Sequence, residues 1–97
     1  MRNVHIEKIE EKYGQALFQM GLTHLIDVGA RNFTDEKVDE AIKQIKAENA
    51  EIKARGGCSI MTVNYQIKIV KCAAELAKCD ITELIDYIKE YFIIPEN

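Results

Sequence analysis

The residues with the most chemical potential lie in one short segment that joins two expected helices. It consists of Arg55, Gly56, Gly57, Cys58 and Ser59. Backbone N–H groups at the start of the following helix would bind an anion, assisted by the Arg55 guanidinium. The same position would make the Cys58 thiol nucleophilic. The simpler interpretation, which we favour, is that a glycine ends one helix and Cys58 or Ser59 caps the next.

The number and spacing of the cysteines indicate a reducing compartment. Cys58, Cys72 and Cys79 are an odd number, and none belongs to a Cys-x-x-Cys pair. Cys72 and Cys79 lie two helical turns apart, about 10 Å, which is too far for a disulfide. No apolar leader opens the sequence and no apolar run has the length of a membrane span. We therefore expect free thiols in a cytoplasmic protein that contacts no membrane.

Sequence patterns for metal binding and catalysis are missing. His5 and His24 are the only histidines, and neither belongs to a His-x-x-x-His or His-x-x-Glu spacing. His24 and Asp27 are three residues apart and could share a hydrogen bond on a helix, but such a pair is usually a surface feature. Neither a P-loop nor a Gly-x-Gly-x-x-Gly motif occurs. We therefore expect no enzyme activity, no metal and no cofactor.

The first part of the chain is expected to form two helices. Apolar residues in steps of three and four predict one helix over residues 4–20, with its buried face made by Ile6, Ile9, Tyr13, Ala16 and Met20. Gly21 interrupts this pattern, and residues 22–28 are expected to form a short second helix, or the tail of the first helix if Gly21 is tolerated. Gly14, inside the first helix, costs roughly 1 kcal/mol relative to alanine and suggests a close crossing by another helix.

Capping residues mark two further helices. Thr34 is a favourable N-cap, and acidic residues followed by lysines predict a helix over residues 35–54 that ends at the two glycines. Asp80 has the spacing of a capping box for a helix over residues 81–92. The buried face of this last helix is expected to consist of Ile81, Leu84, Ile85, Ile88, Tyr91 and Phe92.

Residues 60–78 fit two kinds of element. Residues 63–69 alternate between apolar and polar, as in a strand, but Val63, Ile67, Val70, Ala74 and Ala77 also share a helical face. The apolar pattern continues to residue 77, and no other segment alternates to provide a partner strand. We therefore predict a helix that is apolar on most sides and central to the fold.

Composition and length are those of one globular domain over residues 1–97. The 97 residues are 47% hydrophobic and 30% charged, which excludes disorder throughout. Together with the helical spacing, they predict an all-α fold, a compact bundle of four to five helices. No motif covers enough positions to indicate a known family.

One helix carries a narrow apolar stripe with a polar residue in it. The stripe consists of Val38, Ile42, Ile45, Asn49 and Ile52. A single Asn in such a seam can determine the register and oligomeric state of a coiled coil, so a homodimer through this helix is one interpretation. The stripe covers barely two heptads, however, and the alternative is a seam within one chain.

Two function classes remain. The leading one is a small intracellular regulator or inhibitor, of phage or bacterial type, that acts by binding another protein. Its candidate contact residues are acidic: Asp35, Glu36, Asp39, Glu40, Glu83, Asp86 and Glu90. The alternative is a dimeric nucleic-acid-binding transcriptional regulator with a basic patch in residues 55–78, formed by Arg55, Lys68, Lys71 and Lys78. The net charge of −3 and the acidic residues on the candidate recognition helices make nucleic acid the less favoured partner.

Overall fold

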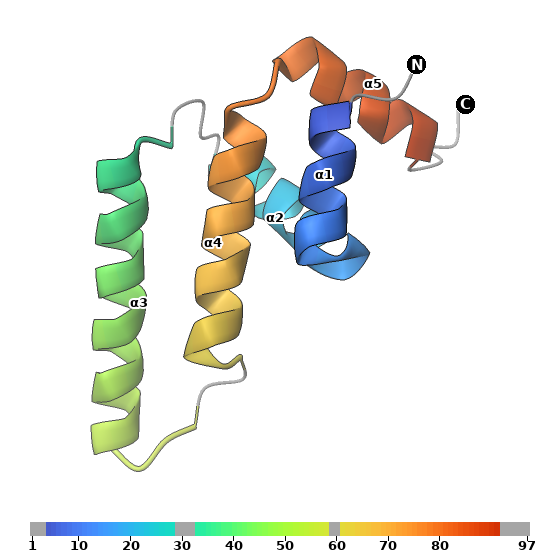
Figure 1. The fold of residues 1–97 in the computed structure, drawn as a ribbon. Coiled ribbons are helices and arrows are strands. Elements are labelled where there is room, and N and C mark those ends of the chain that lie inside the picture. Colours follow the sequence, from blue (N-terminus) through green and yellow to red (C-terminus); the bar gives the residue numbers. More distant parts are fainter. Residues whose placement is uncertain (1–3, 29–32, 59–60, 92–97) are drawn as a thin grey trace.

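The described part of the chain forms an all-α bundle. The computed structural model describes residues 4–28, 33–58 and 61–91, and these contain five helices and no strand (Figure 1). The helices are α1 (Val4–Tyr13), α2 (Gln15–Val28), α3 (Asp35–Ala54), α4 (Val63–Ala77) and α5 (Ile81–Tyr91). The all-α prediction is therefore confirmed, and residues 63–69 are helical as expected.

Helix α4 lies at the centre and packs against α1, α2 and α3. One of its faces carries Cys72 and Leu76, which join the core cluster with Ile6, Ile9 and Phe18. The helix begins later than predicted, because Thr62 is the N-cap and its side chain accepts a hydrogen bond from the Tyr65 N–H. The expectation that Cys58 or Ser59 caps this helix was wrong.

The break between the first two helices lies at Gly14, and the prediction of one helix over residues 4–20 was wrong. Gly14 has a φ of 83°, in the left-handed region that favours glycine, so α1 ends at Tyr13 and α2 begins directly after Gly14. The turn changes which residues face inwards. In α2 the buried residues include Phe18, Leu22 and Leu25, whereas Ala16 is exposed.

The close helix crossing lies at Gly21 and not at Gly14. Gly21 is buried within α2, and a Cβ atom built on it would lie 3.1 Å from Cys72 Sγ and 3.3 Å from the Ala73 backbone nitrogen. A Cβ built on Gly14 would meet no atom within 4 Å. The missing side chain of Gly21 therefore lets the backbone of α2 approach α4 closely.

Helix α3 agrees with its predicted boundaries but packs differently from the others. Thr34 caps it by accepting from the Lys37 N–H, and Gly56 follows its end with a φ of 77°. None of its residues is fully buried, and its main contact is with α4. The two helices run side by side as an antiparallel pair that extends beyond α1 and α2 (Figure 1), which helps explain why the molecule measures 49 × 29 × 25 Å.

Among its described side chains, helix α5 places Leu84 and Tyr87 in the core. Asp80 caps it, since its Oδ1 accepts from the Thr82 N–H at 2.8 Å. Leu84 and Tyr87 are buried, and the Tyr87 ring packs edge-on against Phe18 with the ring centroids 5.4 Å apart. The expectation that Ile85 is buried was wrong, because it is 45% exposed. The remaining predicted positions, Ile81, Ile88, Tyr91 and Phe92, lie outside the described side chains.

The Gly21 crossing generates a stability prediction. Alanine inside a helix normally gains roughly 1 kcal/mol over glycine. At Gly21 we expect the opposite, a loss of about 1–2 kcal/mol in the free energy of unfolding, because the new methyl group overpacks against the α4 backbone. Urea unfolding followed by circular dichroism measures this. Gln19→Ala, an exposed position on the same helix, should change the value by less than about 0.5 kcal/mol. A Gly21→Ala protein more stable than the parent would contradict the close crossing.

Candidate functional site

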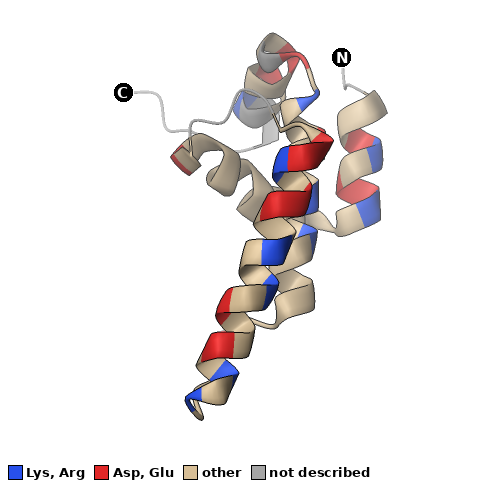
Figure 2. Cartoon of the chain, turned by 90° about the vertical axis from the view of Figure 1, so that its left-hand side faces the viewer, with Lys and Arg blue, Asp and Glu red and all other residues tan. Residues whose placement is uncertain are grey.

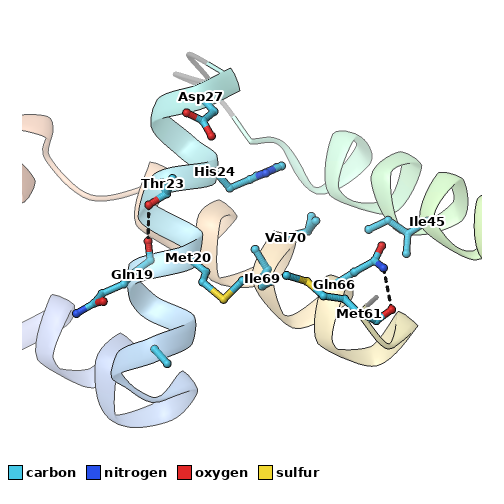
Figure 3. A pocket seen from close by; sticks show the side chains of 11 residues that line it. Gln19, Met20, Thr23, His24, Asp27, Ile45, Met61, Gln66, Ile69 and Val70 are labelled. Atoms are coloured by element: carbon cyan, nitrogen blue, oxygen red, sulfur yellow. Dashed lines mark hydrogen bonds between the residues drawn. The ribbon is translucent and has the colours of Figure 1, made fainter. Parts of the chain in front are cut away.

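An open groove of about 780 Å³ lies between α2 and α3, with α4 as its floor (Figure 3). From α2, it is lined by a row of residues that includes Ala16, Met20, Thr23 and Asp27. These positions are three or four residues apart, so they share one side of the helix. Because Phe18, Leu22 and Leu25 occupy the core side of α2, the Ala16–Met20 side, which the sequence predicted as core, lines the groove instead.

The floor and the far wall of the groove are mainly apolar. Ile69 and Val70 of α4 form part of the floor, and Ile45 of α3 and Met61 also line it (Figure 3). The amide of Gln66 also lines the groove and donates a hydrogen bond to the Met61 carbonyl oxygen at 3.1 Å. This apolar surface is suited to binding another apolar surface.

The described part of the groove lining contains one formal charge. Asp27 lies at the C-terminal end of α2 and is exposed, and the lining includes neither lysine nor arginine. His24 also lines the groove, but the described structure records no hydrogen bond between it and Asp27. The described lining residues therefore show no hydrogen-bonded catalytic pair.

The structure describes only part of the predicted anion site after α3, so this site stays a prediction. Arg55 Nη2 lies 2.5 Å from Glu51 Oε1, so the guanidinium is held by its own helix. Gly56 and Gly57 follow the helix end, Cys58 is exposed, and Ser59 lies outside the described residues. Because α4 begins at Val63, its first N–H groups lie several residues beyond this segment.

The predicted acidic contact residues lie on two helices. Asp35, Glu36, Asp39 and Glu40 are exposed on the first turns of α3, and Glu83 and Asp86 are exposed on α5, while the side chain of Glu90 is not described. Asp35 lies 3.8 Å from Lys78 Nζ at the end of α4. Figure 2, which looks onto α3, shows acidic and basic residues alternating along this helix. The candidate acidic residues on α3 are therefore interspersed with lysines.

The residues of the predicted basic patch are spread over the length of the α3–α4 pair. Arg55 lies just beyond the C-terminal end of α3, whereas Lys78 lies beside Asp35 at the other end of that helix, about 30 Å away along its axis. Both are engaged by carboxylates, as described above. Lys68 and Lys71 remain exposed on α4. The geometry gives a nucleic-acid interface less support than the groove gives protein binding.

The predicted dimer seam faces the partner helix of the same chain. Val38, Ile42, Ile45 and Asn49 are half-buried, while Ile52 is 38% exposed. Asn49 Nδ2 donates to the Ile45 carbonyl oxygen at 2.8 Å, so this amide bonds within its own helix. Helix α4 already covers part of this stripe. A homodimer through the stripe stays a prediction.

Sequence reasoning missed a polar cluster that joins α1 to α4. Glu75 Oε1 lies 3.0 Å from both Lys12 Nζ and the Tyr13 hydroxyl oxygen, which donate hydrogen bonds to it. The bond to Glu75 raises the pKa of Lys12, and partial burial together with the same bond raises the pKa of Tyr13. Because these residues are more than 60 positions apart, no local spacing could have revealed the cluster.

The buried thiols are poor nucleophiles. Burial raises the pKa of Cys72 to about 12, and burial with the nearby Glu83 and Glu75 carboxylates also raises the pKa of Cys79. Among the described residues, no group of three or more His, Cys, Asp or Glu side chains could hold a metal ion. None of the described helices has the length and apolar character needed to cross a bilayer.

Comparison with known proteins returned no match to a family model, a curated protein or a solved structure. The proposed function therefore rests on the groove and the surface charges.

The exposure of the three thiols predicts their reactivity. In the folded protein at pH 7.5, we expect one thiol to react rapidly with a disulfide reagent such as DTNB, because only Cys58 is exposed. Cys79 should react more slowly and Cys72 only on unfolding. The Cys58→Ser variant should lose the rapid phase. Rapid reaction of two thiols in that variant would contradict the packing of α4.

The raised pKa of Cys72 predicts a loss of stability in alkali. The unfolded thiol ionises near its ordinary value of 9.0, whereas the folded one stays protonated to about pH 12. The unfolded state therefore releases a proton first, and stability falls as the pH rises through this window. Between pH 8 and 10 the parent should lose up to about 1.4 kcal/mol more than Cys72→Ala. Denaturant unfolding at the two pH values measures this difference, and equal losses would contradict it.

Proposed function

We propose that this protein is a small binding module that takes an apolar segment of another protein into the groove between α2 and α3. The observation that carries the proposal is the groove itself, which opens to solvent and is lined by the half-buried Met20, Ile45 and Met61 above the buried Ile69 and Val70. Apolar surface exposed to water in a concave site is a characteristic of binding surfaces, because covering it is favourable. The module would act by binding its partner and not by catalysing a reaction.

The surroundings of the groove support protein binding over catalysis. Among the described lining residues, six side chains are apolar, and the polar ones are Gln19, Thr23, His24, Asp27 and Gln66. His24 and Asp27 share no recorded hydrogen bond. A catalytic site needs a nucleophile or a proton-transfer group close to a partner that activates it. Because Cys72 is buried and protonated and Cys58 lies outside the groove lining, neither thiol supplies such a group.

We further propose that binding serves a regulatory or inhibitory role in the cytoplasm. A module of 97 residues without a catalytic constellation can regulate a partner by covering its surface. The acidic residues on the outer side of α3 would add long-range attraction to a basic partner and increase its rate of association.

A charged side chain placed in the groove should abolish binding. Thr23 is exposed and lines the groove, so Thr23→Arg adds a guanidinium over the apolar floor without disturbing the core. Gln15→Arg is the matched control, because Gln15 is exposed on the same helix but outside the groove lining. Both variants should unfold within about 0.5 kcal/mol of the parent protein.

The probe is a library of random 15-residue peptides displayed on phage and selected on the parent protein. Selected peptides should bind Gln15→Arg as they bind the parent, and Thr23→Arg at least about tenfold more weakly by fluorescence anisotropy. A selection that gives no binder, or binders that do not distinguish the two variants, would refute the groove as the binding site.

A further inference from the structure

We propose that the occupant of the groove is an amphipathic α-helix of a partner protein that carries a lysine or arginine opposite Asp27. The inference rests on the proposed function and specifies the chemistry of its partner. Three observations carry it: the length of the groove wall, the side chains on its floor and the sign of its one formal charge.

The groove wall is straight and has the length of a short helix. Its α2 side runs from Ala16 to Asp27, which at 1.5 Å per residue is about 17 Å, or three helical turns. Because the lining residues of α2 recur every three or four positions, they form a ridge along the helix. A helix laid beside α2 can pack its own apolar ridge against this one, with Ile45 of α3 on its far side (Figure 3).

The floor of the groove can adapt to an apolar helix face. Met20 and Met61 both line it, and methionine side chains are flexible and polarisable, so they fit branched or aromatic side chains of different shape. The Tyr65 hydroxyl donates to Met20 Sδ at 3.4 Å, which places this thioether at the junction between α2 and α4. Ile69 and Val70 provide a firmer surface between the two methionines.

The charge of the groove selects for a cationic partner. Among the described residues that line the groove, Asp27 alone carries a formal charge, and it forms no ion pair with the residues that the structure describes. The whole chain has a net charge of −3, which favours the same sign of partner. A cation beside Asp27 would lie next to apolar surface, where screening by water is weaker than in bulk solvent.

Two synthetic helical peptides of 14 residues test the inference. Both carry leucines at positions 3, 7, 10 and 14, and the flanking positions are lysine in one peptide and glutamate in the other. A third peptide has the lysine flanks and a central Lys→Pro substitution, which breaks the helix. Binding is measured by fluorescence anisotropy to the parent protein and to Asp27→Lys, with Asp39→Lys as control, because Asp39 is exposed on α3 outside the groove lining.

We expect the lysine-flanked peptide to bind the parent at least about fivefold more tightly than the glutamate-flanked one. Asp27→Lys should remove or reverse this preference, Asp39→Lys should retain most of it, and the proline peptide should bind at least about tenfold more weakly. Equal effects of the two charge substitutions would overturn the inference, because net charge alone would then explain the preference. A proline peptide that binds like its parent peptide would overturn the helical form of the occupant.

Two further outcomes separate the inference from the proposed function. If the phage selection gives groove-dependent peptides that are neither helical nor basic, the proposed function stands and the inference fails. If light scattering shows a dimer that Thr23→Arg dissociates, a second copy of this chain fills the groove and the inference of a foreign helix is likewise overturned.

Discussion

The crossing of α2 over α4 at Gly21 is the contact on which the rest of the fold depends. A Cβ at this position would lie 3.1–3.3 Å from Cys72 and the backbone of Ala73, tighter than most Cβ contacts, so glycine favours this approach. The close approach places Phe18 and Leu22 of α2 beside Leu76 in one core cluster. Because these residues occupy the core side of α2, its other side, with Met20 and Thr23, is left facing α3.

The groove follows from how few neighbours α3 has. This helix packs mainly on α4, and none of its residues is fully buried. Helix α2 packs on another side of α4. The space between the two is lined by side chains from all three helices that remain partly accessible. Contact between water and the apolar side chains of such a groove is unfavourable, so covering them lowers the free energy. This is the physical reason for proposing a binding partner there. The carboxylate of Asp27 in the described lining would then favour a cationic partner, as proposed.

Much of the secondary structure could be predicted from local spacing, and the reason is that helix caps and periodicity are local. Thr34 and Asp80 cap helices as expected, and Gly56 follows the end of α3. The long apolar pattern through residue 77 correctly favoured a helix over a strand for residues 63–69. The error at Gly14 arose because Ile6, Tyr13 and Met20 keep helical spacing across a turn, so periodicity alone did not reveal the change in direction.

The candidate site is formed by residues that are far apart in the sequence, so local sequence patterns could not reveal it. The sequence by itself determined that the chain is all-α, where most of its helices lie, and that it lacks the spacings of known catalytic and metal-binding motifs, because each of these properties depends on residues within a few turns of one another. Only the tertiary structure decided that Gly21 is the crossing point, that Glu75 joins Lys12 and Tyr13, and that Met20, Ile45 and Met61 line one groove. These residues are brought together by the packing of whole helices, and that packing depends on which of several similar apolar faces buries the most surface.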